Sequence, residues 1–69
     1  MTLAEFNKLK LKIPENPGVY FFVGPRRKIL YIGKAAVLRD RTRSYFSPDL
    51  IDTRGEHIVR MVEKARTIE

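Results

Sequence analysis

The residues of this chain that could carry out chemistry are tyrosines, lysines and arginines. Its three tyrosines are Tyr20, Tyr31 and Tyr45, and cations lie in the sequence between the last two. Such groups suit hydrolysis of a phosphodiester, which needs a base to take a proton from water and cations to stabilise charge on the phosphate oxygens. A phenol has a pKa of about 10 and is a weak base at neutral pH, but nearby cations or a metal favour the phenolate.

These residue types also have an ordinary structural explanation, which their chemistry alone favours. Tyrosine in a strand often covers the edge of a core, and the stems of lysine and arginine cover apolar surface. Other chemistries are excluded more firmly. The chain has no cysteine, so it has no thiolate nucleophile, thiolate metal site or disulfide. It also lacks a Walker-type phosphate loop and a Rossmann fingerprint.

Metal-ligating residue types are few and scattered. The single histidine, His57, has no partner at metal-ligand spacing, so a solvated surface position is expected. Asp49, Asp52 and Glu56 lie close in sequence and could hold a cation. Turn and capping roles explain these three acids better.

The charge balance points to a polyanionic partner. Fourteen Lys and Arg residues against eight acids give a formal net charge of +6 on 69 residues. This excess favours nucleic acid over simple solubility or an anionic membrane surface. The longest apolar run, Val19 to Val23, is far too short to span a bilayer, and no signal-peptide pattern opens the chain. We expect one cytoplasmic domain over residues 1–69, with an N-terminal helix or arm over residues 1–13.

Two strands must position the first two tyrosines. Residues 18–23 and 28–34 are rich in Val, Ile, Tyr and Phe, and Gly24-Pro25-Arg26-Arg27 supplies a turn between them. If these four residues form a tight turn, Val23 faces Lys28 and Tyr20 lies directly opposite Tyr31. The Cβ atoms of two opposed residues lie roughly 5 Å apart on one face of a sheet. The sequence therefore predicts a hairpin in which two phenols face each other.

Helices are expected on both sides of this hairpin. Leu3, Phe6 and Leu9 have helical spacing and predict a short N-terminal helix that frays near Lys10. Pro14 and Pro17 then favour an extended approach to the first strand.

A second helix is predicted over residues 35–46, ending at Ser47-Pro48. At 100° per residue, Lys34, Leu38, Arg41 and Tyr45 fall on one stripe, whereas Arg39 and Arg43 project from another side. The start of this helix lacks a good N-cap residue.

Residues 49–52 read as a connector to a further helix. Thr53-Arg54-Gly55-Glu56 fits a capping box at its start. Its apolar face would comprise Ile58, Met61, Val62 and Ala65. Residues 67–69 look like the beginning of another strand, so we expect the chain to be a fragment of something longer.

The strand residues also resemble a known family signature. Gly18-Val19-Tyr20 and Tyr31-Ile32-Gly33 resemble the two halves of the GIY-YIG nuclease motif, at a suitable separation. The continuation through Lys34-Ala35, Leu38 to Arg41 and Ser44-Tyr45-Phe46 is most similar to the UvrC-like branch of that family. The resemblance covers roughly residues 10–69.

This resemblance implies a fold, a reaction and partners. The fold would be a small α/β (α+β) domain with a central antiparallel sheet flanked by helices and an incomplete third strand. The parent protein would be a DNA endonuclease that cuts 3′ to a lesion in nucleotide excision repair, with one divalent metal, Mg²⁺ or Mn²⁺. Its partners would be DNA and UvrA-like and UvrB-like repair subunits. This chain alone is expected to cut little or nothing.

The resemblance also implies roles for individual residues. Tyr31 would act as general base, and Tyr20 would help to position the water. Gly33 would let the chain turn closely beside the site, and Lys34 and Arg41 would lie near the scissile phosphate. Tyr45 would be a further phenol of the active site. The residues implied or proposed to contact DNA are Lys34, Arg39, Arg41 and Arg43.

The chain departs from the family pattern at two places. Val37 stands where family members usually have a polar residue, and Ala36 where they often have a basic one, which predicts weaker helix capping and DNA contact. The metal-binding glutamate of the family is expected beyond Glu69, on a helix after the third strand, so no residue here is assigned as a metal ligand and Glu63 does not take that role. A non-catalytic nucleic-acid-binding module with the same fold is the alternative, and another type of GIY-YIG nuclease is disfavoured by the flanking residues.

Overall fold

The computed structural model describes residues 1–69 and forms an α+β fold with a three-stranded antiparallel sheet, which confirms the expected fold class. The strands lie in the order β2-β1-β3. The helices and strands are α1 (Leu3–Leu9), β1 (Gly18–Val23), β2 (Ile29–Ala35), α2 (Leu38–Arg43), α3 (Leu50–Arg54), α4 (Glu56–Lys64) and β3 (Thr67–Ile68). Short 3₁₀ turns cover Lys10–Lys12, Pro25–Arg27 and Ser44–Phe46.

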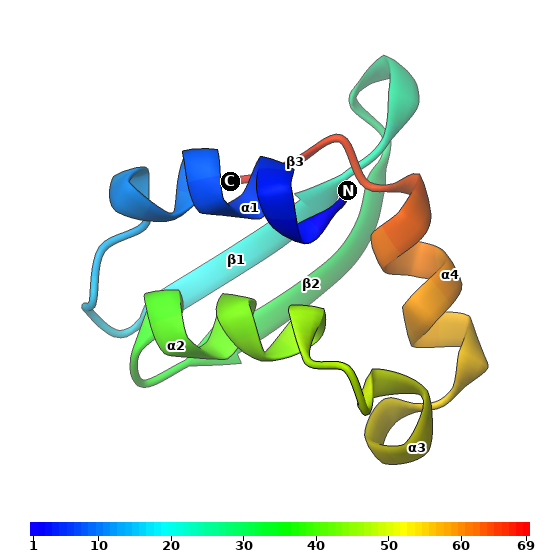
Figure 1. The fold of residues 1–69 in the computed structure, drawn as a ribbon. Coiled ribbons are helices and arrows are strands. Elements are labelled where there is room, and N and C mark those ends of the chain that lie inside the picture. The colour runs from blue at the N-terminus through cyan, green and yellow to red at the C-terminus, as the bar shows by residue number, and fades with distance from the viewer.

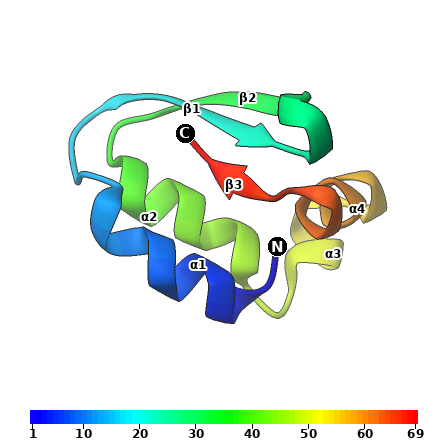
Figure 2. The same cartoon turned by 90° about the horizontal axis from the view of Figure 1, so that it is seen from above.

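The helices lie on one side of the sheet (Figure 1). When the molecule is viewed from above, α1 and α2 run beneath the strands, and α3 and α4 lie beneath the hairpin end (Figure 2). Strand alternation explains this one-sided arrangement. Tyr20 and Phe22 of β1 face the helices and are buried, whereas Val19 on β1 and Ile32 on β2 are 48% and 57% exposed. Side chains on the inner face of the sheet therefore lie between the sheet and the helices or at the edge of this interface.

The predicted hairpin register is wrong by two residues. Tyr20 pairs with Gly33, not with Tyr31, and Tyr31 pairs with Phe22. The register then shifts at an irregularity between Phe22 and Val23. Because side chains alternate with a period of two, a two-residue displacement keeps Tyr20 and Tyr31 on the same face of the sheet.

The conformation of the connection explains the difference in register. A four-residue tight turn was expected, but Pro25–Arg27 form a 3₁₀ turn closed by a bond from the Lys28 amide to the Pro25 carbonyl, at 3.2 Å, and the Gly24 amide donates to the Lys28 carbonyl at 2.7 Å. Arg26 and Arg27 both have positive φ angles, 60° and 62°. Non-glycine residues adopt this left-handed conformation only at a cost, so sequence preference does not suggest it here.

The second predicted helix starts later than expected. Lys34 and Ala35 belong to β2, where they pair with Val19 and Gly18, and α2 begins at Leu38. Lys34 is therefore not part of a helical stripe. Val37 occupies the N-cap position and makes no side-chain cap bond, as predicted from its apolar character.

Backbone carbonyls take the place of the missing cap. The amide of Leu38 donates to the carbonyl of Asn16 at 3.0 Å, and the amide of Arg39 donates to the carbonyl of Pro14 at 3.2 Å. The extended segment that Pro14 and Pro17 impose thus satisfies two of the first amides of α2. This contact fixes α2 against the approach to β1.

The predicted capping box at Thr53 is also wrong. Residues 50–54 form a helix, α3, in place of a connector, and the Thr53 hydroxyl donates back to the carbonyl of Asp49 at 3.2 Å. Gly55, with a φ of 91°, separates α3 from α4 and is the N-cap residue of α4. The predicted apolar face of α4 is confirmed, since its four residues, Ile58, Met61, Val62 and Ala65, are all buried.

The N-terminal helix is confirmed and does carry a capping box. The Glu5 amide donates to the Thr2 hydroxyl at 3.2 Å, and the Thr2 amide donates to the Glu5 carboxylate at 2.9 Å. Phe6 is fully buried and stacks on Phe46, with ring centroids 4.7 Å apart. This contact ties α1 to the end of α2.

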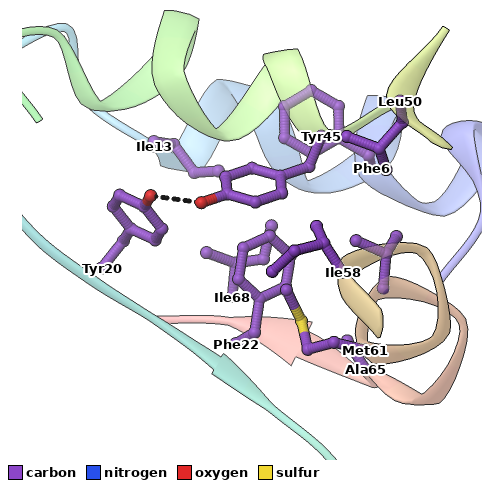
Figure 3. Close-up of a cluster of buried hydrophobic side chains, with 11 residues drawn as sticks. Phe6, Ile13, Tyr20, Phe22, Tyr45, Leu50, Ile58, Met61, Ala65 and Ile68 are labelled. Carbon is purple, nitrogen blue, oxygen red and sulfur yellow. Dashed lines mark hydrogen bonds between the residues drawn. The ribbon is translucent and has the colours of Figure 1, made fainter. Parts of the chain in front are cut away.

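The core draws on every layer of the fold. Figure 3 shows Phe22 of β1 and Ile68 of β3 facing side chains from α1, α4 and the segment after α2. β3 pairs antiparallel with β1, with Phe22 opposite Ile68, which confirms the predicted strand at the end of the chain. No helix in the structure has the length and apolar character needed to cross a bilayer.

Candidate active site

Three phenols meet between β1, β2 and the segment that follows α2. The hydroxyls of Tyr20 and Tyr45 lie 2.7 Å apart and share a hydrogen bond, and these side chains are 3% and 1% exposed (Figure 3). The ring of Tyr31 lies 6.1 Å from that of Tyr45, centroid to centroid, in an edge-on arrangement. Tyr31 is the only half-buried member, so it is the phenol that solvent or a ligand can reach. We call these three residues the phenol cluster.

Gly33 makes room for this cluster. A Cβ atom at Gly33 would lie 2.3 Å from both Cζ and Oη of Tyr20, far inside van der Waals contact. The ring of Tyr20 therefore lies directly across the backbone of its paired residue. Gly33 was expected to allow a close turn of the chain, but it lies within β2 and its φ is not positive. It is needed for the space it leaves to Tyr20.

The cluster raises the pKa values of two of its phenols. Burial is the main cause that raises the pKa of Tyr45 above its ordinary value, and the hydrogen bond to Tyr20 adds to it. The pKa of Tyr31 is also raised, chiefly by its electrostatic interaction with Tyr45, although Arg54 and Arg41 act in the opposite direction. The two arginines thus favour the phenolate of Tyr31, as expected, but the interaction with Tyr45 outweighs them and the pKa stays above its ordinary value.

Arg54 is a member of this site that sequence reasoning missed. Its guanidinium carbon lies 4.8 Å above the centre of the Tyr45 ring, a cation–π contact. Because residues 49–52 read as a connector and Arg54 as part of a capping box, no periodic pattern directed attention to it. Its place at the end of α3 depends on a helix that was not predicted.

The predicted grouping of Lys34, Arg41 and Tyr45 is only partly found. Arg41 on α2 lies close enough to Tyr31 to lower its pKa, and it carries no ion pair. Lys34 lies on the edge strand β2 and pairs with Val19 of the central strand β1. Because side chains alternate along a strand, the Cβ of Lys34 points to the other face of the sheet from Tyr31. Lys34 therefore lies on the other face of the sheet from the phenol cluster and would have to reach around the sheet edge.

The two other predicted DNA contacts lie away from the cluster. Arg39 donates from Nε to the carbonyl of Ile13 at 2.9 Å and pairs with Glu15 at 2.7 Å. Arg43 pairs with Asp40 at 3.5 Å on the surface of α2 and remains largely exposed. Arg39 thus joins α2 to the segment before β1, whereas the exposed side chain of Arg43 is accessible to a ligand.

Acidic residues do not gather anywhere in the structure. No group of three or more His, Asp or Glu side chains is placed to hold a metal ion. His57 is exposed on α4, and the Asp49 carboxylate accepts a hydrogen bond from the Ser47 hydroxyl. The residues present therefore do not form a metal site by themselves, and we derive no step of a reaction through a metal.

Comparison with known proteins matches this arrangement to one family. The family model of the UvrC-like GIY-YIG domain matches residues 16–69. A UvrABC system protein C from Haloarcula marismortui is 50% identical over 60 residues, which cover 83% of this chain and 10% of that protein. The homologue from Carboxydothermus hydrogenoformans is 44% identical over 72 residues and covers all of this chain.

Solved structures extend the match to the fold. The GIY-YIG N-terminal endonuclease domain of UvrC from Thermotoga maritima, bound to its catalytic divalent cation, aligns with a TM-score of 0.73 and 38% identity. The match covers all of this chain and 69% of that domain. In another structure of the same domain the catalytic cation is magnesium. This chain spans about a tenth of the length of the curated relatives it matches. It belongs to the UvrC-like GIY-YIG family.

Proposed function

We propose that these residues supply the phenolic and cationic part of a DNA endonuclease active site in a UvrC-like excision-repair protein. The observation that carries the proposal is the phenol cluster, in which both tyrosines of the GIY-YIG motif meet Tyr45 beside two arginines. The parent protein would hydrolyse a phosphodiester on the 3′ side of a lesion. A net charge of +6 suits its DNA substrate.

We assign the chemical role to Tyr31 and the positioning roles to its neighbours. Tyr31 is the accessible phenol and would take the proton from the attacking water as general base. Tyr20 and Tyr45 are buried and bonded to each other, so they hold the site rigid and do not exchange protons readily with solvent. Gly33 keeps Tyr20 in place, and Arg41 would stabilise charge on the phosphate oxygens.

The raised pKa of Tyr31 sets a condition on this role. Only the phenolate can accept a proton. As long as the pH is below the pKa, the phenolate fraction rises about tenfold for each unit by which the pH increases. The cleavage rate should therefore rise with pH throughout the neutral range. The solved relatives bind a catalytic divalent cation, Mg²⁺ in one case, and we propose that the parent protein requires Mg²⁺ or Mn²⁺ as well.

The remaining cations would hold the DNA backbone. We propose Lys34, Arg41 and Arg43 as backbone contacts, because Lys34 and Arg41 carry no ion pair and the Arg43 side chain is 66% exposed despite its pairing with Asp40. Arg39 was assigned to the same task, but its ion pair with Glu15 gives it a structural role first. We also propose partners of the UvrA and UvrB type, which the name UvrABC system protein C of the relatives supports, and a place of action in the cytoplasm.

A second function has two observations in its favour. The structure contains no group of acids or histidines fit for a metal, and the pKa of Tyr31 is raised. A non-catalytic module that binds DNA through the same surface would share both features. The two functions differ in whether the parent protein cuts DNA at all.

The test is nicking of a duplex that carries one bulky adduct. The parent polypeptide is assayed with UvrA-type and UvrB-type subunits in Mg²⁺ and in Mn²⁺, and its Tyr31→Phe variant is compared with Arg60→Gln. Arg60 is an exposed residue of α4 paired with Glu56, so Arg60→Gln serves as the control that should keep full activity. We expect Tyr31→Phe to lose nicking but not DNA binding. Undiminished nicking by Tyr31→Phe would exclude the base role, and binding without nicking by the wild type would favour the non-catalytic module.

A further inference from the structure

A broad hollow opens beside the phenol cluster and has no assigned occupant. Its volume is about 390 Å³, and it lies between α2 and the end of α3. Arg41 contributes from α2 and Arg54 from α3. The residues that line it are Ala36, Val37, Asp40, Arg41, Ser44 and Arg54. Two guanidinium groups from different helices thus border the same open space.

Neither of these guanidinium groups is neutralised within the protein. The ion pairs of the structure use Arg27, Arg39, Arg43 and Arg60. Asp40 is the one acid on the wall of the hollow, and Arg43 already pairs with it at 3.5 Å. The hollow therefore carries a net positive charge, and an anion that entered it would meet two cations without displacing an internal partner.

Arg54 is held in place before any ligand arrives. Its guanidinium lies on the Tyr45 ring, and the Tyr45 hydroxyl is bonded in turn to Tyr20. Gly55, with its φ of 91°, directly follows Arg54 and is the C-cap residue at which α3 ends. A guanidinium already positioned loses less conformational freedom on binding, and its planar fork matches two oxygens of a phosphate.

We propose that Arg54 binds one backbone phosphate of a DNA strand at this hollow, next to the phosphate that Tyr31 and Arg41 approach. The proposal rests on the proposed function, since it takes DNA as the ligand. Arg54 holds the strand while the phenol cluster meets the neighbouring phosphate. Its contact with Tyr45 links the binding of the strand directly to the cluster.

The test counts phosphate contacts through the salt dependence of binding. Binding of a fluorescently labelled duplex to the 69-residue chain is measured by anisotropy, without divalent cations, between about 50 and about 200 mM NaCl. Arg54→Gln should weaken binding on the order of tenfold. It should also reduce the slope of log K against log salt by about 0.9, the value for one phosphate contact. Arg60→Gln removes the same charge from α4 and should leave the slope unchanged.

Two further measurements separate a contact from a folding defect. Arg54→Lys keeps the charge but not the fork, so it should retain the slope and lose only part of the affinity. A series of duplexes is tested, each with one phosphate replaced by a neutral methylphosphonate. At one position the replacement should weaken DNA binding by the wild type but not by Arg54→Gln. The proposal would be overturned if Arg60→Gln lowered the salt slope as much as Arg54→Gln does. It would also be overturned if no methylphosphonate position distinguished the wild type from Arg54→Gln. If the wild type binds no DNA, the proposed function fails with it; if only the Arg54 effects are missing, the proposed function stands.

Discussion

Replacing Gly33 by alanine is the sharpest test of how the site is built. The new Cβ would lie 2.3 Å from Cζ and Oη of Tyr20, whereas ordinary van der Waals contact begins near 3.4 Å. The Tyr20 ring must therefore move by about 1.1 Å, the difference between these two distances. If the movement is along the bond to Tyr45, the separation of the hydroxyls grows from 2.7 Å to about 3.8 Å and the hydrogen bond is lost.

The expected loss of stability has two parts. Overpacking a dense core costs about 1–3 kcal/mol. A buried hydroxyl left without a partner costs about 1–3 kcal/mol more, and Tyr45 would be in that position. The sum, about 2–6 kcal/mol, is comparable with the total stability of about 3–10 kcal/mol expected for a chain of this length. Gly33→Ala should therefore be largely unfolded or close to it.

Urea denaturation followed by far-UV circular dichroism and tyrosine emission measures this loss, since the chain has no tryptophan. Gly18→Ala is the matched control on the neighbouring strand, because its Cβ would meet only the flexible end of Leu38, at 3.0 Å. In a Tyr20→Leu background the clashing ring atoms are gone, so Gly33→Ala should cost much less there. An equal cost in both backgrounds, or none in the wild type, would refute this explanation of Gly33.

Three further predictions concern the phenols and the first helix. Tyr45→Phe strands the hydroxyl of buried Tyr20 and should lower the free energy of unfolding by about 1–3 kcal/mol in urea titrations; an unchanged midpoint would contradict the buried bond. Because the folded state raises the pKa of Tyr31 and Tyr45, it holds these protons more tightly than the unfolded chain, so stability should fall as pH rises above about 10. Ultraviolet titration of tyrosinate should show Tyr31 and Tyr45 ionising at a higher pH than free tyrosine, and ionisation at the ordinary pKa would contradict this prediction. Thr2→Ala removes the capping box with Glu5 and should cost about 1 kcal/mol, with lower helicity by circular dichroism; equal helicity would show that the cap is not needed.

Local preferences in the sequence predicted much of the fold. Runs of Val, Ile, Tyr and Phe identified β1 and β2, and helical spacing identified α1 and the buried face of α4. The expected pairing placed Tyr20 and Tyr31 on one face, and this conclusion survived a two-residue error in register because the period of a strand is two. The tyrosines and Gly33 also carried the family resemblance, so the kind of chemistry could be inferred before the geometry was known.

Contacts between distant segments decided the rest of the site. The register depended on left-handed conformations at Arg26 and Arg27, which no local preference favours. The start of α2 depended on carbonyls of the segment before β1 and on pairing of Lys34 with Val19, which took Lys34 out of the predicted stripe.

The position of Arg54 on the Tyr45 ring shows most clearly what the sequence alone could not predict. α3 is only five residues long, too short to be stable alone, and it forms where Leu50 is buried against the core. Residue types and spacing by themselves determined that phenols and cations belong together in this protein. Which cations reach the phenols was decided by tertiary packing, because a guanidinium can act on a phenol only where long-range contacts place the two side by side.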